Sequence, residues 1–191
     1  MKLLCLMTCF LIVTTGTLSD FTTEEIDGLN KHNLFRMVHK VPIMTLDRQM
    51  CNEAKAYAEK LASWKNLTHA SLTDQGENLY YGCQPGKAAS TKKAVRGWYF
   101  EVCYPGYDFI DGPIESGTGH FTQVVWRESI KLGIGRAVTN DKYGNPCGYI
   151  VARYKPAGNV IGRFKQNVLK GDYNAEAYCS QAVQQEKEVI R

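Results

Sequence analysis

The stretch GHFTQVVW, residues 119–126, is the main clue to the fold, because it places one histidine at the start of a continuous apolar run. In an extended chain, alternation would place His120, Thr122, Val124 and Trp126 on one face and the intervening residues on the other. The run therefore predicts a buried strand that begins at His120. A single histidine in such a position is most often a core residue with a satisfied hydrogen bond, so its role depends on the rest of the chain.

The segments around this run predict a layered α+β domain. Apolar and small residues recur at helical spacing over residues 22–39, 47–64 and 88–102, which predicts three helices. A loop rich in Gly and Pro follows over residues 103–119. Strands are expected at residues 121–126, 131–139 and 148–154, and the turn sequence NDKYGNP at 140–146 joins the last two as an antiparallel hairpin. Helices first and antiparallel strands last is the order typical of an α+β fold.

The two ends of the chain differ in character from this domain. Residues 1–19 combine one lysine, an apolar run and then small residues, which predicts a secretory signal peptide. That run is too short to cross a bilayer, and no later segment reaches about 18 consecutive apolar residues, so we expect no transmembrane anchor. We expect the folded domain to cover residues 20–170 and the polar residues 171–191 to form a C-terminal tail. The predicted location is secreted, extracellular.

Charge and cysteine content indicate which partners and which chemical environment to expect for this protein. Loss of Lys2 with the signal peptide changes the formal charge from +4 to +3, and the basic residues are scattered, so no nucleic-acid partner is expected. The secretory pathway is oxidising and therefore favours disulfides. Asn66-Leu67-Thr68 is a sequon for glycosylation in the same pathway. Five cysteines remain after the signal peptide is removed. They allow two bridges and one free thiol in several pairings, which stay open: Cys51, Cys83, Cys103, Cys147 and Cys179.

Three other residues could join His120 in one cleft. His69 lies after the second predicted helix, Glu77 follows a glycine turn, and Glu101 lies near the end of the third helix. Each alone would be an ordinary surface residue. Imidazole and carboxylate groups together could bind a cation or exchange protons. Spacing does not show whether they converge, because they are far apart in sequence.

Several motifs in order resemble the CAP superfamily, which includes cysteine-rich secretory proteins, antigen 5, pathogenesis-related 1 and secreted venom-allergen-like proteins. They are LNKHNLFR at 29–36, GENL at 76–79, GHFTQVVW at 119–126 and YIVARYKPAGNVIG at 149–162. The resemblance implies a three-layer α–β–α sandwich with a central, mainly antiparallel sheet. It also implies a cleft formed by two histidines and two glutamates, at His69, Glu77, Glu101 and His120. Gly119, Ile134 and Ala152 stand where some relatives have cysteine, so their disulfide scheme is not transferred.

The implied cleft is compatible with two chemistries. His69 and His120 could hold Zn²⁺ or another divalent cation weakly, with Glu77 and Glu101 orienting the rings. Alternatively, Glu77 or Glu101 could act as a general base beside a histidine in a metal-dependent hydrolase or peptidase. The resemblance attaches no general reaction to this cleft, so whether the chain is an enzyme stays open.

The resemblance also implies binding of small hydrophobic ligands, namely sterols or fatty acids, with a role in lipid transport or in contact with a host or other extracellular protein. We expect sterol at the aromatic loop and fatty acid between the first and third helices. The simpler interpretation of the aromatic residues is that they anchor the loop on the core. The loop residues are Tyr99, Tyr104, Tyr107, Phe109 and Ile110, and those between the helices are Leu29, Phe35, Met37 and Val38.

Overall fold

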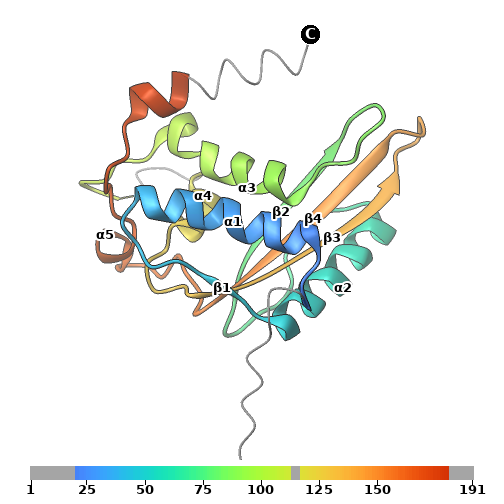
Figure 1. The fold of residues 1–191 in the computed structure, drawn as a ribbon, viewed down its shortest axis with the longest axis horizontal. Helices are drawn as coiled ribbons and strands as arrows, with labels where there is room; N and C mark the ends of the chain where they lie inside the picture. Colours follow the sequence, from blue (N-terminus) through green and yellow to red (C-terminus); the bar gives the residue numbers. More distant parts are fainter. Residues whose placement is uncertain (1–19, 113–116, 181–191) are drawn as a thin grey trace, which may run out of the picture.

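The computed structural model describes residues 20–112 and 117–180 (Figure 1). The predicted signal peptide and the end of the predicted tail lie outside the described residues. The helices are α1 (Thr23–Val38), α2 (Arg48–Trp64), α3 (Thr91–Phe100), α4 (Gly119–Val124) and α5 (Phe164–Asn167), with a π-helical turn, η2, at Val102–Gly106. The strands are β1 (Thr45–Leu46), β2 (Gly76–Cys83), β3 (Lys131–Asn140) and β4 (Pro146–Lys155). Among the described residues, no helix is both long and apolar enough to span a membrane.

The four strands form one sheet in the order β1-β3-β4-β2, in which only β1 and β3 run parallel. Alternate residues of β4 face two different hydrophobic clusters. Tyr149 and Val151 pack with residues of α2, whereas Ile150 and Ala152 pack with residues of α1 and α3. Helices therefore cover both faces of the sheet (Figure 1). The expected α+β, three-layer α–β–α sandwich is confirmed.

Helix α2 approaches the sheet closely because both surfaces carry small residues. Ala54 and Ala58 are fully buried on the helix. On β3, a Cβ atom at Gly133 would lie 2.3 Å from the Met50 carbonyl carbon, and one at Gly135 would lie 2.2 Å from the Lys55 nitrogen. Any side chain at either glycine would push the helix off the sheet. The expected second helix is thus confirmed, and the glycines of the hairpin explain its position.

Buried Arg36 joins α1 to the segment that follows α4. Its guanidinium group donates to backbone carbonyls, at 2.7 Å to Pro42, 2.9 Å to Val124, 2.9 Å to Trp126 and 2.8 Å to Ser129. Burial lowers the pKa of this guanidinium to about 10. The carbonyls at the end of α4, which have no intrahelical partner, thereby gain donors.

Two expectations for the secondary structure need correction. Residues 119–124 form the helix α4 rather than the start of a strand, and Gly76–Cys83, which we had not expected to be extended, is the edge strand β2. The run from Phe121 to Trp126 is buried on every side. A continuous apolar run carries no periodicity that separates strand from helix. The two long strands of the expected hairpin are confirmed.

The cysteines pair as Cys83–Cys147 and Cys103–Cys179, which settles the pairing left open by the sequence. Cys51 is free and fully buried, and burial raises its thiol pKa to about 11. A buried thiol with a high pKa is chemically inert. The second disulfide attaches residues 171–180 to the core, where Tyr173 is buried.

Candidate functional site

His120 is held at the start of α4 by a carboxylate from the end of α3. Glu101 Oε1 lies 2.6 Å from His120 Nδ1, and Glu101 Oε2 accepts from the backbone N–H groups of His120 and Phe121 at 2.9 and 3.0 Å. The first N–H groups of a helix have no partner within the helix, so Glu101 both caps α4 and orients the imidazole. Helix α4, and not a strand, delivers His120 to this place.

His69 is held in the same way by Glu77, on β2. Glu77 Oε1 lies 2.7 Å from His69 Nδ1 and accepts from the Ala70 backbone N–H at 3.0 Å. Glu77 stands directly opposite Arg153 in the β2–β4 register. The Arg153 Nη2 atom lies 3.0 Å from Glu77 Oε2, at ion-pair distance but without the angle of a hydrogen bond. Both side chains are buried, with 4% of Glu77 and 5% of Arg153 exposed.

Asn78 connects the two His–Glu pairs. Asn78 follows Glu77 in the chain. Its Nδ2 donates to the His120 carbonyl at 3.0 Å and to the Tyr154 hydroxyl at 3.1 Å. Tyr154 in turn donates to Nε2 of buried His32 at 2.9 Å, while His32 Nδ1 donates to the Gly28 carbonyl. A hydrogen-bonded chain thus runs from α1 through the sheet to His120. The two His–Glu pairs are thus joined through Asn78, whereas a shared cleft stays a prediction.

In both pairs the carboxylate contacts Nδ1 of the imidazole, which leaves Nε2 available as a ligand. A histidine that donates Nδ1–H to a carboxylate is oriented as histidines are in metal sites. The side chains of His69 and His120 are 63% and 38% exposed, so solvent ions can reach them. Two nitrogen ligands satisfy half of the tetrahedral coordination of Zn²⁺, and water or a ligand would complete it.

The two carboxylates are better placed to orient histidines than to take protons from a substrate. Both oxygens of Glu101 already accept hydrogen bonds. The second oxygen of Glu77 is inaccessible to solvent. A general base must come within hydrogen-bond reach of the proton that it removes. Neither carboxylate meets this requirement without rearrangement.

Another cluster of potential metal ligands consists of Cys83, Asp141 and Cys147. Its two sulfur atoms are joined in a disulfide. The thiolate is the form of cysteine that binds metal. This cluster therefore does not provide a metal site.

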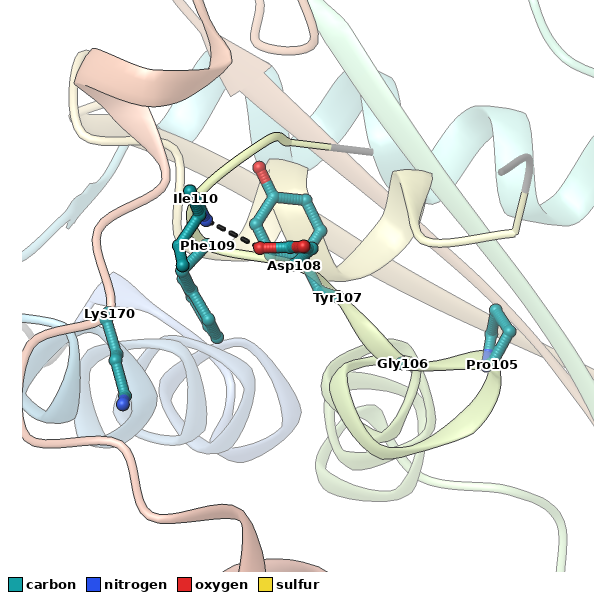
Figure 2. A pocket seen from close by; sticks show the side chains of 7 residues that line it. All are labelled: Pro105, Gly106, Tyr107, Asp108, Phe109, Ile110 and Lys170. Carbon is teal, nitrogen blue, oxygen red and sulfur yellow. Dashed lines mark hydrogen bonds between the residues drawn. The ribbon is translucent and has the colours of Figure 1, made fainter. Parts of the chain in front are cut away.

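The loop after α3 forms a pocket of about 660 Å³ (Figure 2). Tyr107, Phe109 and Ile110 line it, and these three were predicted to contact lipid. Ile110 is 77% exposed, and the neighbouring Tyr104, also a predicted lipid residue, is 78% exposed. Tyr99 instead lies buried in the core, where burial raises the pKa of its hydroxyl. The loop thus combines anchored aromatic residues with exposed ones.

The residues expected to form a groove between α1 and α3 are mostly in contact with protein. Leu29 and Phe35 are buried, Val38 is half-buried, and Met37 is exposed. The Phe35 ring stacks on Tyr99 with centroids 3.7 Å apart, and Tyr178 of the C-terminal segment packs edge-on against both rings. Lipid binding between these helices stays a prediction.

Sequence reasoning missed three residues that shape these sites. Arg153 and Asn78 are recognised only from the strand register, because nothing in the sequence pairs them with Glu77 or His120. A signal for Arg153 was present, since it is the one charged residue in the apolar run YIVARY. Lys170 lines the loop pocket from a distant part of the chain.

Comparisons with known proteins agree with this architecture. Residues 29–154 match the family described as "CAP: Cysteine-rich secretory protein family". Golgi-associated plant pathogenesis-related protein 1 of Homo sapiens is 38% identical over 148 residues, which cover 74% of this chain and 89% of that protein. Secreted protein RBT4 of Candida albicans is 37% identical over 134 residues, covering 70% of this chain and 35% of that protein.

Among solved structures, the crystal structure of NaASP2 with Zn²⁺ superposes with a TM-score of 0.57 at 22% identity, covering 84% of this chain and 93% of that one. This likeness supports the fold. The family match over residues 29–154 and the 38% identity with the human relative show that the chain belongs to the CAP family of cysteine-rich secretory proteins.

Proposed function

We propose that this chain is a secreted CAP-domain protein that binds a lipid, either a sterol or a fatty acid, in the pocket of the loop at residues 105–110. The observation that carries the proposal is the pocket itself, which has aromatic and aliphatic walls and leaves Ile110 largely exposed. Covering an isoleucine side chain is worth about 1.5–3 kcal/mol. A hydrophobic ligand would gain that free energy, whereas the free protein leaves the side chain in water.

Replacement of one exposed residue tests this proposal. Ile110→Ser should weaken binding of a sterol or fatty-acid probe at least about tenfold, because apolar contact area is lost. Ile161→Ser is the matched control, since Ile161 is 94% exposed and does not line the pocket. Equilibrium dialysis with labelled ligand measures both. Equal affinities for the wild type and both variants would contradict a site at this loop.

A second proposed property is weak binding of a divalent cation by His69 and His120, with Glu77 and Glu101 orienting the rings. The two His–carboxylate pairs support it, and NaASP2, a structural neighbour, was crystallised with Zn²⁺. Zn²⁺ at about a hundredfold excess over its Kd should stabilise the fold by about 2.7 kcal/mol. Scanning calorimetry should show a raised melting temperature that His120→Ala abolishes. An equal Zn²⁺ response in the double variant His69→Ala/His120→Ala would exclude this site.

Secretion and glycosylation complete the proposal. The leader-type sequence at residues 1–19 supports export, and one relative is named as a secreted protein, although another is named as Golgi-associated. Asn66 is exposed, and its Nδ2 lies 3.2 Å from the Thr68 hydroxyl of the same sequon. Mass spectrometry of protein collected from the culture medium, before and after enzymatic glycan removal, tests both. Recovery of an unmodified chain with residues 1–19 attached would contradict them.

A further inference from the structure

The loop pocket continues into a second one toward the C-terminal segment. The second pocket has a volume of about 550 Å³ and shares four lining residues with the first. These are Gly106, Tyr107, Phe109 and Lys170. In Figure 2, Lys170 and Pro105 lie at opposite sides of the first pocket and the Phe109 side chain lies between them. Among the described residues that line these pockets, Lys170 is the one cationic residue, and it borders both.

Two of the acidic groups near Lys170 are engaged elsewhere. The Asp108 carboxylate accepts from the backbone N–H groups of Ile110 and Asp111, at 2.7 and 3.4 Å. Asp172 pairs with Lys40 at 2.6 Å. Within residues 20–112 and 117–180, no carboxylate lies at ion-pair distance from Lys170. Each pocket also has one carboxylate in its lining, Asp108 in the first and Glu176 in the second, and the Asp108 carboxylate is held by the backbone of its own loop.

The backbone next to Lys170 is fixed by a buried imidazole. His39 Nδ1 donates to the Leu169 carbonyl at 2.5 Å, and His39 Nε2 accepts from the Tyr99 hydroxyl at 2.8 Å. The His39 ring stacks with Phe109 and with Tyr173, with centroids 5.8 and 5.6 Å away. One ring thus links the pocket wall to the chain that carries Lys170. A charge presented from a fixed backbone loses less freedom when it pairs with a ligand.

We propose that Lys170 selects a lipid with an anionic head group, of which the carboxylate of a fatty acid is the simplest example. The Lys170 ammonium pairs with the carboxylate, and the hydrocarbon chain lies along Phe109 and Ile110. This inference rests on the proposed lipid binding at the loop. It differs from the sequence-based expectation, which assigned fatty acid to the surface between α1 and α3.

The test compares two ligands that differ in head group alone, hexadecanoic acid and hexadecanol, at mildly alkaline pH. The wild type should bind the acid about three- to fivefold more tightly than the alcohol, as expected for an exposed ion pair. Lys170→Met should abolish this preference and retain alcohol binding, because the methionine keeps most of the apolar stem. Lys170→Arg should retain the preference. Lys165→Met is the matched control, since Lys165 is exposed and does not line either pocket.

The outcomes separate this inference from the function on which it rests. If neither ligand binds the wild type, lipid binding fails and the selectivity fails with it. If both bind and the acid preference is the same in Lys170→Met as in the wild type, Lys170 is not the selecting residue, although lipid binding stands. A preference lost equally in Lys165→Met would also overturn the inference, because general surface charge would then explain it.

Discussion

The His69–Glu77 pair and the His120–Glu101 pair present the same groups to solvent but are supported differently. Glu77 lies on a strand and is flanked by the buried guanidinium of Arg153. Glu101 lies at the end of a helix and is held by two backbone N–H groups of α4. Glu77 also accepts from one backbone N–H, so its distinctive support is the Arg153 side chain, whereas Glu101 is held by main-chain groups that every residue except proline has. We expect the two pairs to differ sharply in their sensitivity to substitution.

The largest effect is expected at the ion pair. Arg153→Met leaves the Glu77 carboxylate buried without its counter-charge, which should lower the free energy of unfolding by about 3–5 kcal/mol. Urea denaturation measures the change. Arg163→Met is the control, because Arg163 pairs with Glu128 on the surface, where an ion pair is worth about 1 kcal/mol or less. If both variants lost the same free energy of unfolding, the buried Arg153–Glu77 pair would contribute no more to stability than a surface ion pair.

A somewhat smaller effect per residue is expected from acid at two buried histidines, of which His32 is linked to the His120–Glu101 pair. Burial lowers the pKa of His32 and of His39 to about 4, from the usual 6.5. Both are neutral in the folded protein, so the unfolded chain binds more protons as the pH falls from 6.5 to 4. Stability should therefore be complete above pH 6.5 and decrease toward pH 4, by at most about 3 kcal/mol for each histidine.

Replacing each histidine by glutamine, which does not bind a proton, tests whether these two side chains cause the loss of stability in acid. His32 lies behind His120 through Tyr154 and Asn78, so its protonation acts on the helix-supported pair. In denaturation at several pH values, His32→Gln and His39→Gln should each flatten the decrease between pH 6.5 and pH 4. A pH dependence unchanged in the double variant would show that other groups cause the acid sensitivity.

The smallest effect is expected at Glu101. Glu101→Ala removes the cap of α4 and should cost about 0.5–2 kcal/mol. Glu101→Gln should cost less, because an amide oxygen still accepts from the two N–H groups. At the other pair, Glu77→Gln should cost more than Glu101→Gln, since it leaves Arg153 buried without a counter-charge. The reverse order, measured by urea denaturation, would refute the proposed difference in support.

The sequence predicted the helices and strands whose apolar residues follow a regular spacing within the segment itself. Helices α1, α2 and α3 and the β3–β4 hairpin follow from apolar spacing and turn residues. The segment 119–126 was misassigned because it is buried all round, and β2 was missed because its pairing with β4 is a tertiary contact. The four site residues came from family resemblance, since no local pattern brings His69 to Glu77 or His120 to Glu101. Their supports depend on strand register and helix capping, which appear only in three dimensions.

The two disulfides determine what happens to this protein when a protease cleaves its chain. Cys83–Cys147 and Cys103–Cys179 enclose overlapping stretches of chain. Any single cleavage between residues 83 and 179 therefore falls inside at least one covalent ring. Exposed sites such as Ile161 can be cut without releasing a fragment. A nicked molecule keeps the loop pocket and the histidine pairs in one covalent unit, and its fragments separate only on reduction.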